Sequence, residues 1–524
     1  MKHTPQPRTP SFYDSCIGEA YVPEDHILRR IRAAVDFSFV HDLLADLYHD
    51  SVGRPAHDQE MIFRLIFVQI HYDLSDRQVI ERAQTDHAFR FFLGIDWNHE
   101  LPHPTSLTKF RNRLGEERFK AIFTRILRQA QELGLVSGRR VLIDSSSVRA
   151  DVAVPSFRSL LERVLARALD ALEGTEVDLD YLRAEYRALA EDRSDLMVKS
   201  IRDRLLSEWL SLAELVAEAL ASLPERTDAQ EESLQLLDAA LQRAENHGKR
   251  NVRKDDLLSD VDPDARWSSK KRGKKSEPGY QQQLAVDAEH DVVTNVDVLP
   301  GNTDDSEALQ SMVDGHTEQV GLKPDEVVAD SKYQSGENRA DLVEKRVTDH
   351  VASPPPKGSK QGRFSVSDFL IEFNEAGAPV AMLCPALKLA VEPKWKEDNH
   401  AWVFYFRKAQ CEGCPLRAQC STSKRGRSVS VDEHYLLTQA ARERQASAEG
   451  VTAQRERYRI ERQFAMQKQR GGGRTRYRGI ENNRLLGWAW GIYLNVMTIA
   501  RCVSEGVMEL ARPPGQELYT EGAK

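Results

Sequence analysis

Two short apolar runs, each closed by an aspartate, constrain the fold of this chain most strongly. The runs Val141–Asp144 and Val327–Asp330 are β-prone, and helical patterns stand between and around them. Helices inserted between strands indicate an α/β core. A carboxylate at the C-terminal edge of a strand is held rigidly and can face a partner from a neighbouring strand. A single aspartate in that position more often forms a turn or caps a helix, so the two acids need independent support.

A third acid stands on a later helical segment, Gln454–Lys468. Arg457, Glu461 and Lys468 follow at i, i+4 and i+11, which places them on one broad face of a helix. Two strand acids and a helical glutamate offer oxygen ligands for a pair of Mg²⁺ ions, which clamp both oxygens of a phosphoryl displacement. The two flanking cations suit phosphate contacts. The alternative is a solvated helix with an ordinary Arg457–Glu461 salt bridge.

Glu456 is a rival for the role of the third acid. It lies five residues before Glu461 and about 140° away around a continuous helix, so the two cannot face the same ions. Glu461 is preferred because it alone lies between Arg457 and Lys468 in the i, i+4, i+11 pattern.

Charge is unevenly distributed along the 524 residues. Lys and Arg number 73 against 81 Asp and Glu, a net charge of −8, yet residues 161–248 carry 20 acidic and 10 basic residues. That acidic helical stretch is expected to be a solvated or protein-contacting insertion. Residues 455–484 hold 10 basic and 3 acidic residues interleaved with aromatics, which indicates a DNA-tracking surface that includes Arg474, Arg476 and Arg478.

A second basic segment covers residues 266–275, where six of ten residues are Lys or Arg. A mobile loop of this kind contacts DNA backbone, here through Lys270, Lys271 and Arg272. A loop that merely improves solubility is the alternative.

The first part of the chain, residues 25–133, has a helical pattern. Ser75 is predicted to cap a helix over Asp76–Gln84, and Asp86 to begin the next. A helix after Pro104 carries Lys109, Arg111 and Arg113. Short helices, tight turns and a late basic helix resemble a helix-turn-helix assembly, although a plain helical bundle fits the spacing equally well.

Four cysteines gather late in the chain. Cys384, Cys411, Cys414 and Cys420 include a Cys-x2-Cys knuckle followed by a longer spacing, and Pro follows two of them. Four thiolates of this kind suit a structural Zn²⁺ ion, with four buried free thiols as the alternative. Because only six cysteines occur in all, a reducing cytoplasm is expected.

Two further segments bear on the fold and the location. Alternating patterns at Gln281–Ala288 and Val292–Leu299 predict a hairpin with its turn at His290-Asp291. The apolar run Leu485–Ala500 is too short for a membrane span and is expected to be a buried helix. No targeting segment is apparent in the polar N-terminus, and no membrane association is expected.

These segments resemble the DDE transposases of bacterial insertion sequences, within the eleven-eighty-two group of the four/five-type superfamily. The resemblance covers most of the chain. It rests on the N-terminal stretch GRPAHDQEMIFRLIFVQIHYDLSDRQVIERAQTDHAFRFFLGID, VLIDSSSVRAD, DPDARW, LPGNTDDS, VVADSKYQSGEN and the run RYRIERQF…RYRGIENN…YLNVMTIAR. The family signature around the third acid is Tyr-x2-Arg-x3-Glu-x6-Lys. Gln454 stands where the tyrosine is usual.

The resemblance implies an RNase H-like core in which Asp144, Asp330 and Glu461 are the catalytic metal ligands. It implies two Mg²⁺ (or Mn²⁺) ions, positioning of phosphate by Arg457 and Lys468, and a homodimer on DNA. The activity implied is binding of terminal inverted repeats, cleavage at the element ends and joining of the 3′-OH to target DNA, at the bacterial nucleoid. A nuclease without strand transfer and a non-catalytic DNA-binding protein are the alternatives.

The expected organisation follows from these segments. A helical N-terminal DNA-binding domain (1–135) precedes the first core strand (136–154), the acidic helical insertion (155–255) and the RNase H-like core (256–352). A Cys-rich β insertion (353–430), C-terminal core helices with the third acid (431–510) and a tail (511–524) complete the chain.

Overall fold

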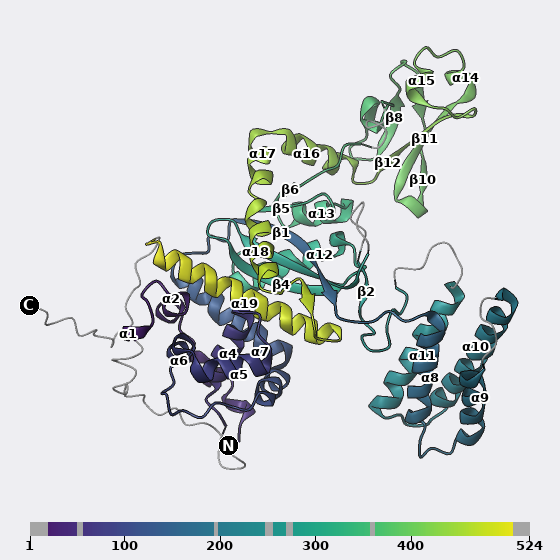
Figure 1. Ribbon diagram of the computed structural model, residues 1–524. Coiled ribbons are helices and arrows are strands. Elements are labelled where there is room, and N and C mark those ends of the chain that lie inside the picture. The colour runs from purple at the N-terminus through teal and green to yellow at the C-terminus, as the bar shows by residue number, and fades with distance from the viewer. Residues whose placement is uncertain are drawn as a thin grey trace, which may run out of the picture.

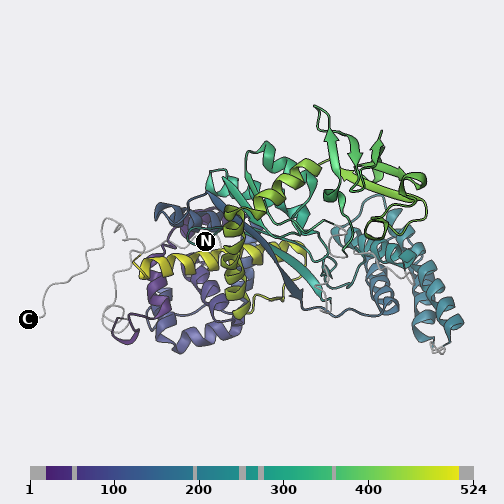
Figure 2. The ribbon, with the colours of Figure 1, turned by 90° about the horizontal axis from the view of Figure 1, so that it is seen from above.

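A central mixed sheet organises the chain (Figure 1). The computed structural model describes residues 19–49, 56–192, 198–246, 255–268, 276–356 and 362–506. Helices cover both faces of the sheet, while a group of four helices and a small β module extend away from it (Figures 1 and 2). The predicted α/β class is therefore confirmed.

The longest strand of the sheet, β1 (Arg140–Ala150), lies at its centre. It pairs antiparallel with β3 (Pro278–Asp287) and parallel with β5 (Glu326–Ala329), which in turn pairs parallel with β6 (Thr348–Val351). β3 also pairs antiparallel with β4 (Val292–Pro300) and β2 (Arg266–Trp267), and β13 (Arg474–Thr475) pairs parallel with the end of β1. The hairpin predicted around His290-Asp291 is confirmed as β3 and β4.

Alternation along the strands gives the sheet two apolar faces. On one face Val141, Ile143 and Ala285 pack with α12 (Asp305–Val320) and α13 (Gly336–Glu344). On the other face Leu142 and Leu284 join a larger core with the N-terminal helices and with α18 (Tyr458–Gln469) and α19 (Ile480–Ser504). Helices from the two ends of the chain thus share one core with the sheet.

The N-terminal helices begin and end largely where local signals place them. Ser75 caps α5 (Asp76–Thr85) with a full capping box, and Asp86 caps α6 (His87–Leu93), as predicted. α7 (Thr105–Glu132) bends at Gly115, whose φ of 64° favours glycine. The remaining elements of this region are α1 (Glu19–Tyr21), α2 (Ile27–Ala34), α3 (Phe39–Leu43), the 3₁₀ turn η2 (Ala45–Leu47) and α4 (Gln59–His71).

α19 is the buried helix that the apolar run predicts. Almost all of its residues from Leu485 to Ala500 are buried, and it packs against α7, α2 and β4. The tight contact with β4 depends on Gly487 and Gly491, because a Cβ there would lie 2.7 and 2.8 Å from valine side chains of that strand. In the described ranges of the chain, no helix is long and apolar enough to cross a membrane.

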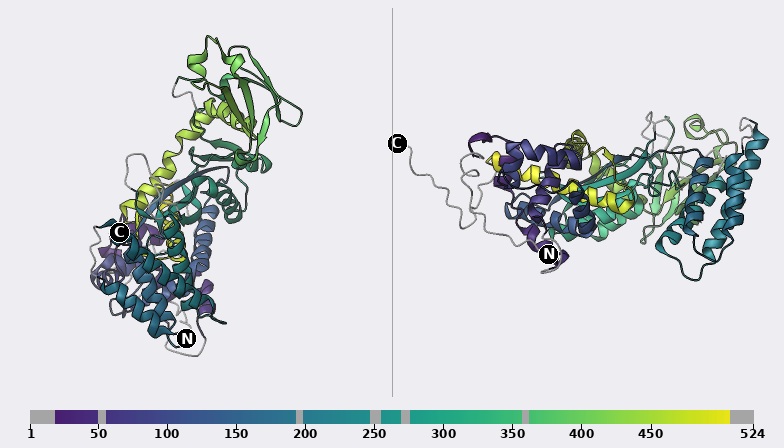
Figure 3. Two further views of the ribbon diagram at one scale, coloured as in Figure 1. Left: turned by 90° about the vertical axis from the view of Figure 1, so that its right-hand side faces the viewer. Right: turned by 60° about the horizontal axis from the view of Figure 1, so that its bottom comes forward.

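Four helices between β1 and β2 form a unit with its own apolar core. They are α8 (Phe157–Ala171), α9 (Leu179–Glu191), α10 (Lys199–Ala221) and α11 (Asp228–Asn246). Leu165, Trp209 and Leu237 are fully buried in this core, which is distinct from the cores on the sheet. Figure 3 shows the four helices at one end of the molecule.

A small β module follows β6. It contains two three-stranded sheets, β7 (Leu370–Phe373) to β9 (Leu389–Val391) with β8 (Pro379–Leu383) between them, and β10 (Lys394–Lys396), β11 (Ala401–Arg407) and β12 (Gly426–Asp432). The short turns η4 (Val366–Asp368), η5 (Glu397–Asn399), α14 (Lys408–Cys411) and α15 (Arg417–Cys420) complete it.

The helical segment after the module is broken, which corrects the prediction that Glu456 and Glu461 share one continuous helix. It consists of α16 (Tyr435–Ala446), α17 (Ala448–Arg455) and α18. Ser447 is extended, with ψ of 160°, and its side chain caps α17. The serine therefore ends one helix and begins the next through a local hydrogen bond.

Candidate active site

Asp144 lies within β1 and not at its end. It is the fifth of eleven residues, because Ser145 to Arg149 continue to pair with β3. The sequence-based prediction of a strand that closes at Asp144 is therefore wrong. The residues that prolong the strand are polar, and the ladder with β3, distant in sequence, keeps them extended.

Asp330 directly follows β5, as predicted. Ile143 pairs with Ala329 in the parallel ladder, so the next residues, Asp144 and Asp330, are neighbours on adjacent strands. Paired residues project to the same face of a sheet. Burial raises the pKa of Asp144, and the charge of Asp330 raises it further against the opposing effect of Arg457. Two neighbouring carboxylates at one point of the sheet repel each other, so positive charge placed there stabilises the site.

Arg457 supplies one of the cations at this point. Its Nη2 lies 3.1 Å from Oδ2 of Asp144. Arg457 is the residue before α18, and its carbonyl accepts a hydrogen bond from the Glu461 N–H at 3.3 Å. Glu461 therefore stands one turn further along the same edge of the helix.

The position of Glu461 follows from its neighbours on α18. Arg462 from the next position binds Asp291 in the β3–β4 turn, and Ile460 and Phe464 face the core. Glu461 itself is exposed, on the edge that it shares with Arg457. Arg457 reaches Asp144 from this edge. Lys468, the next member of the predicted frame, is exposed at the last turn of α18.

Glu456, the rival acid, is engaged elsewhere. It belongs to the end of α17 and not to the helix of Glu461, so the expectation of a single helix for both is wrong. Its Oε2 lies 2.9 Å from Arg140, which also binds Glu326 at 2.6 Å. Arg140 precedes Asp144 by four residues on β1, so Glu456 faces a different stretch of that strand.

A buried polar network behind the two acids escaped the sequence-based reasoning. Asp305, only 3% exposed, accepts hydrogen bonds from Gln281, from Gln283 at 3.3 Å and from Lys332 at 2.9 Å. Its neighbour Asp304 caps α12 with a full capping box. A sequence signal that could have indicated this network is Lys332, which lies two residues after Asp330.

Lys332 links this network to the two acids. Burial lowers the pKa of Lys332, but its hydrogen bond to Asp305 and the charges of Asp305, Asp330 and Asp144 outweigh burial and raise that pKa. The ammonium is thus held charged beside the carboxylates. Arg457 and Lys332 together balance the negative charge of the site.

The basic residues predicted on α7 separate into two kinds. Lys109 and Arg113 are exposed. Arg111 is buried, and its guanidinium lies 2.6 Å from Asp76 and 3.1 Å from Gln69. Helical periodicity explains the difference, because Arg111 shares the inner face of α7 with Leu107. Arg111 joins helices and does not face solvent, which corrects its predicted role as a DNA contact.

The other predicted DNA contacts lie near β13 and in a loop. Arg474, Arg476 and Arg478 are exposed, while the intervening Thr475 is buried. Pairing of β13 with the end of β1 fixes this stretch on the sheet. The three basic residues Lys270, Lys271 and Arg272 lie outside the described residues.

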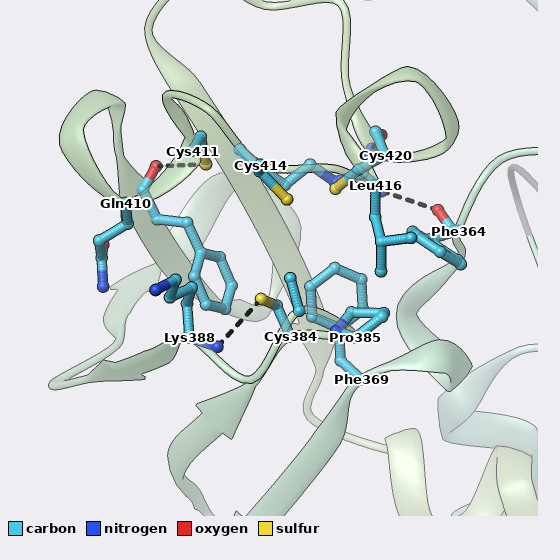
Figure 4. A pocket seen from close by; sticks show the side chains of 13 residues that line it. Phe364, Phe369, Cys384, Pro385, Lys388, Gln410, Cys411, Cys414, Leu416 and Cys420 are labelled. Carbon is cyan, nitrogen blue, oxygen red and sulfur yellow. Dashed lines mark hydrogen bonds between the residues drawn. The ribbon is translucent and has the colours of Figure 1, made fainter.

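The four cysteines lie around one pocket of the β module (Figure 4). Each of the four is half-buried: Cys384, Cys411, Cys414 and Cys420. Phe364 and Phe369 line the same pocket. Burial raises the pKa of the Cys420 thiol, and the other three thiols raise it further against the effect of Arg427. The topology therefore brings together four sulfurs that are separated by up to 36 positions in the sequence (420 − 384).

Two family models match the chain. One, described as Transposase domain (DUF772), covers residues 17–113, and the other, described as Transposase DDE domain, covers residues 383–499. An uncharacterized protein of Rhizobium meliloti, ORF8 in the nfe locus, is 27% identical over 153 residues, which are 28% of this chain and 74% of that relative. No solved structure matches.

Both matched models describe transposase domains, and the second is of the DDE class. The two matches support an insertion-sequence DDE transposase. A DDE domain implies an RNase H-like core, a divalent metal and a DNA substrate. The second match includes Glu461 and the four cysteines, whereas Asp144 and Asp330 precede it.

Proposed function

We propose that this transposase binds the terminal inverted repeats of its element, cleaves at the element ends and joins the 3′-OH to target DNA. The observation that carries the proposal is the register of β1 and β5. It sets Asp144 beside Asp330, and Arg457 from α18 reaches Asp144 at 3.1 Å. Residues far apart in the sequence thus converge on one point with the chemistry that phosphoryl transfer requires.

Asp144, Asp330 and Glu461 are proposed to hold two Mg²⁺ (or Mn²⁺) ions. Their all-oxygen donor set suits these ions, and the raised pKa of Asp144 marks a carboxylate pair that gains from a bound cation. When bound, two ions of this kind stabilise the attacking and leaving oxygens of an in-line displacement. Lys332 and Arg457 hold the two aspartates in place and limit their mutual repulsion.

The exposed basic residues are proposed to bind DNA. One group follows Glu461 in the sequence and consists of Lys468, Arg474, Arg476 and Arg478. The other group, Lys109 and Arg113, lies on α7, and both α7 and α18 pack against α19. A duplex carries one negative charge about every 1.7 Å, so cations of this kind neutralise phosphates without reading sequence. The loop with Lys270, Lys271 and Arg272 is proposed to contact the backbone, and two chains to act together on the two element ends.

The cysteine cluster is proposed to bind a structural Zn²⁺ ion. Four thiols line one pocket beside the small apolar core of the module. Binding would draw the sulfurs into a tetrahedron and stabilise the module.

The test is a cleavage and strand-transfer assay on element-end DNA with Mg²⁺, comparing wild type with Glu461→Gln. The matched control is Glu456→Gln, a neighbouring glutamate bound to Arg140. We expect Glu461→Gln to lose both products by about 100-fold or more while DNA binding is retained, because a metal ligand is lost. Glu456→Gln is expected to keep most of the activity.

Each other outcome has a distinct meaning. Loss of activity in Glu456→Gln with activity retained in Glu461→Gln would reverse the assignment of the third acid. Cleavage without joining of a pre-cleaved 3′-OH end would identify a nuclease. Binding without any product from wild type would identify a DNA-binding protein.

A further inference from the structure

A second group of potential metal ligands lies at the other end of β5. Glu326, the first residue of β5, His350 of β6 and Glu449 of α17 each offer a ligand atom, and these atoms lie within 4.8 Å of one another. Glu326 and Asp330 stand four residues apart along the chain, roughly 13 Å in extended strand. The group is therefore separate from the site of Asp144 and Asp330.

The sheet register explains why the ligands converge. His350 pairs with Val328 in the parallel ladder, and Val328 shares a face with Glu326 two residues earlier. α17 packs against both β5 and β6 and brings Glu449 to that face. The hydrogen bond at 3.2 Å from Gln454 of α17 to the Ala329 carbonyl holds the helix in this position.

His350 is the unusual member of the group. Its side chain is fully buried, and neither ring nitrogen has a hydrogen-bond partner. The nearest charged atom is Oε2 of Glu326, at 3.5 Å from Nε2. Buried polar atoms are nearly always paired, because an unpaired one loses its bonds to water without compensation. An imidazole that faces two carboxylates without a hydrogen bond is arranged as a ligand for something between them.

Charged groups surround His350. Burial lowers its pKa, and Arg140 and Arg444 add to this effect against the opposing influence of Glu326 and Glu449. Arg140 binds Glu326 through Oε2. The same oxygen faces His350. A carboxylate has about four lone pairs on its two oxygens, so it can serve an arginine and a metal ion together.

We propose that Glu326, His350 and Glu449 bind a transition-metal ion of the Zn²⁺ type that joins α17 to the β5–β6 edge of the sheet. One imidazole nitrogen and two carboxylates suit Zn²⁺ better than Mg²⁺, which prefers oxygen ligands alone. Glu449 is exposed, so water completes the coordination from the solvent side.

The ion would fix the helix that leads to the catalytic residues. α17 ends at Arg455, and Arg457 and Glu461 follow within six residues. A bond from Glu449 to the sheet thus sets where α18 begins. The site is a positioning site, and it stands apart from the proposed chemistry at Asp144.

The test measures Zn²⁺ binding by the full-length protein without DNA, in excess Mg²⁺, by calorimetry and by metal analysis after gel filtration. Glu449→Gln is compared with Glu443→Gln, an exposed glutamate of the preceding helix α16. We expect wild type and Glu443→Gln to bind one more Zn²⁺ per chain than Glu449→Gln, or to bind it about tenfold or more tightly. His350→Gln is expected to match Glu449→Gln.

Co²⁺ separates this site from the cysteines. Thiolate ligands give Co²⁺ an intense near-ultraviolet band that imidazole and carboxylate do not, so Glu449→Gln should keep that band and lose one equivalent of bound ion. Equal stoichiometry and affinity in Glu449→Gln and Glu443→Gln, or no Zn²⁺ bound outside the thiolate site, would overturn the proposal. Circular dichroism of the Glu449→Gln variant verifies that its fold is intact.

Discussion

Single side chains of opposite charge lie close together beside the central sheet. Asp144 and Asp330 stand side by side, and Arg457 and Lys332 offset their repulsion. Neither cation alone offsets the repulsion between the two aspartates. Arg457 contacts Asp144, and the charge of Lys332 acts on both acids at longer range. Other buried groups remain neutral, and His316 of α12 is the clearest example.

His316 makes the stability of the sheet sensitive to acid. It is fully buried, and Nδ1 lies 2.8 Å from Oγ1 of Thr294. Burial lowers its pKa from 6.5 to about 4. The unfolded chain therefore binds the proton more readily. Stability from this group is complete above about pH 6.5 and is lost as pH falls toward 4, by on the order of 3 kcal/mol.

The measurement is urea unfolding between pH 7.5 and 4.5. We expect His316→Gln to lose less stability on acidification than wild type. His103→Gln, a change at an exposed histidine, should follow the wild-type curve. Identical pH dependence in wild type and His316→Gln would show that other groups control the acid response.

At the scale of elements, the turn between β3 and β4 fixes two helices. The carboxylate of Asp291 is 1% exposed and binds Arg462, Arg459 at 3.0 Å and Arg501 at 3.7 Å. The first two arginines come from α18 and the third from α19. Two cations that the sequence assigns to a DNA-tracking surface thus bind a buried carboxylate and orient the helix of Glu461.

Asp291→Asn removes this charge without disturbing the turn. The φ of Asp291 is 65°, a conformation that asparagine tolerates. We expect a loss of about 2–4 kcal/mol in the free energy of unfolding, because three arginines lose their buried anionic partner. Asp314→Asn, which removes an exposed partner of Lys345, should cost under about 1 kcal/mol. Chemical denaturation measures both, and equal losses would contradict the account.

At the scale of the whole molecule, features that depend on local signals could be predicted from the sequence. Features that depend on tertiary contacts could not. Ser75, Asp86 and the turn at Asp291 act within a few residues, and their effects were predictable. The length of β1 depends on β3, more than a hundred residues away, and the burial of Arg111 depends on Asp76 in another helix. The network of Asp305 and Lys332 likewise forms only when the sheet is assembled.

The four helices α8–α11 are expected to fold without the rest of the chain. Their core is closed by their own leucines and by Trp209, with Leu257 as its last member. We expect a fragment of residues 153–260 to be helical and to unfold cooperatively on heating, as circular dichroism would show. A leucine-rich core of this kind unfolds in a single transition. A Trp209→Ala fragment should lose about 3–5 kcal/mol, and an unfolded wild-type fragment would refute the expectation.

The place of this insertion has a consequence for synthesis on the ribosome. Between the end of β1 at Ala150 and the start of β3 at Pro278 lie 127 residues (278 − 150 − 1). At roughly 5–20 residues per second, β1 emerges about 6–25 seconds before its first long partner strand. During that interval the four helices can fold while Asp144 waits on an unpaired strand. If Glu461 has its proposed role, the nascent chain gains its third acid only when the last third of the chain has been translated.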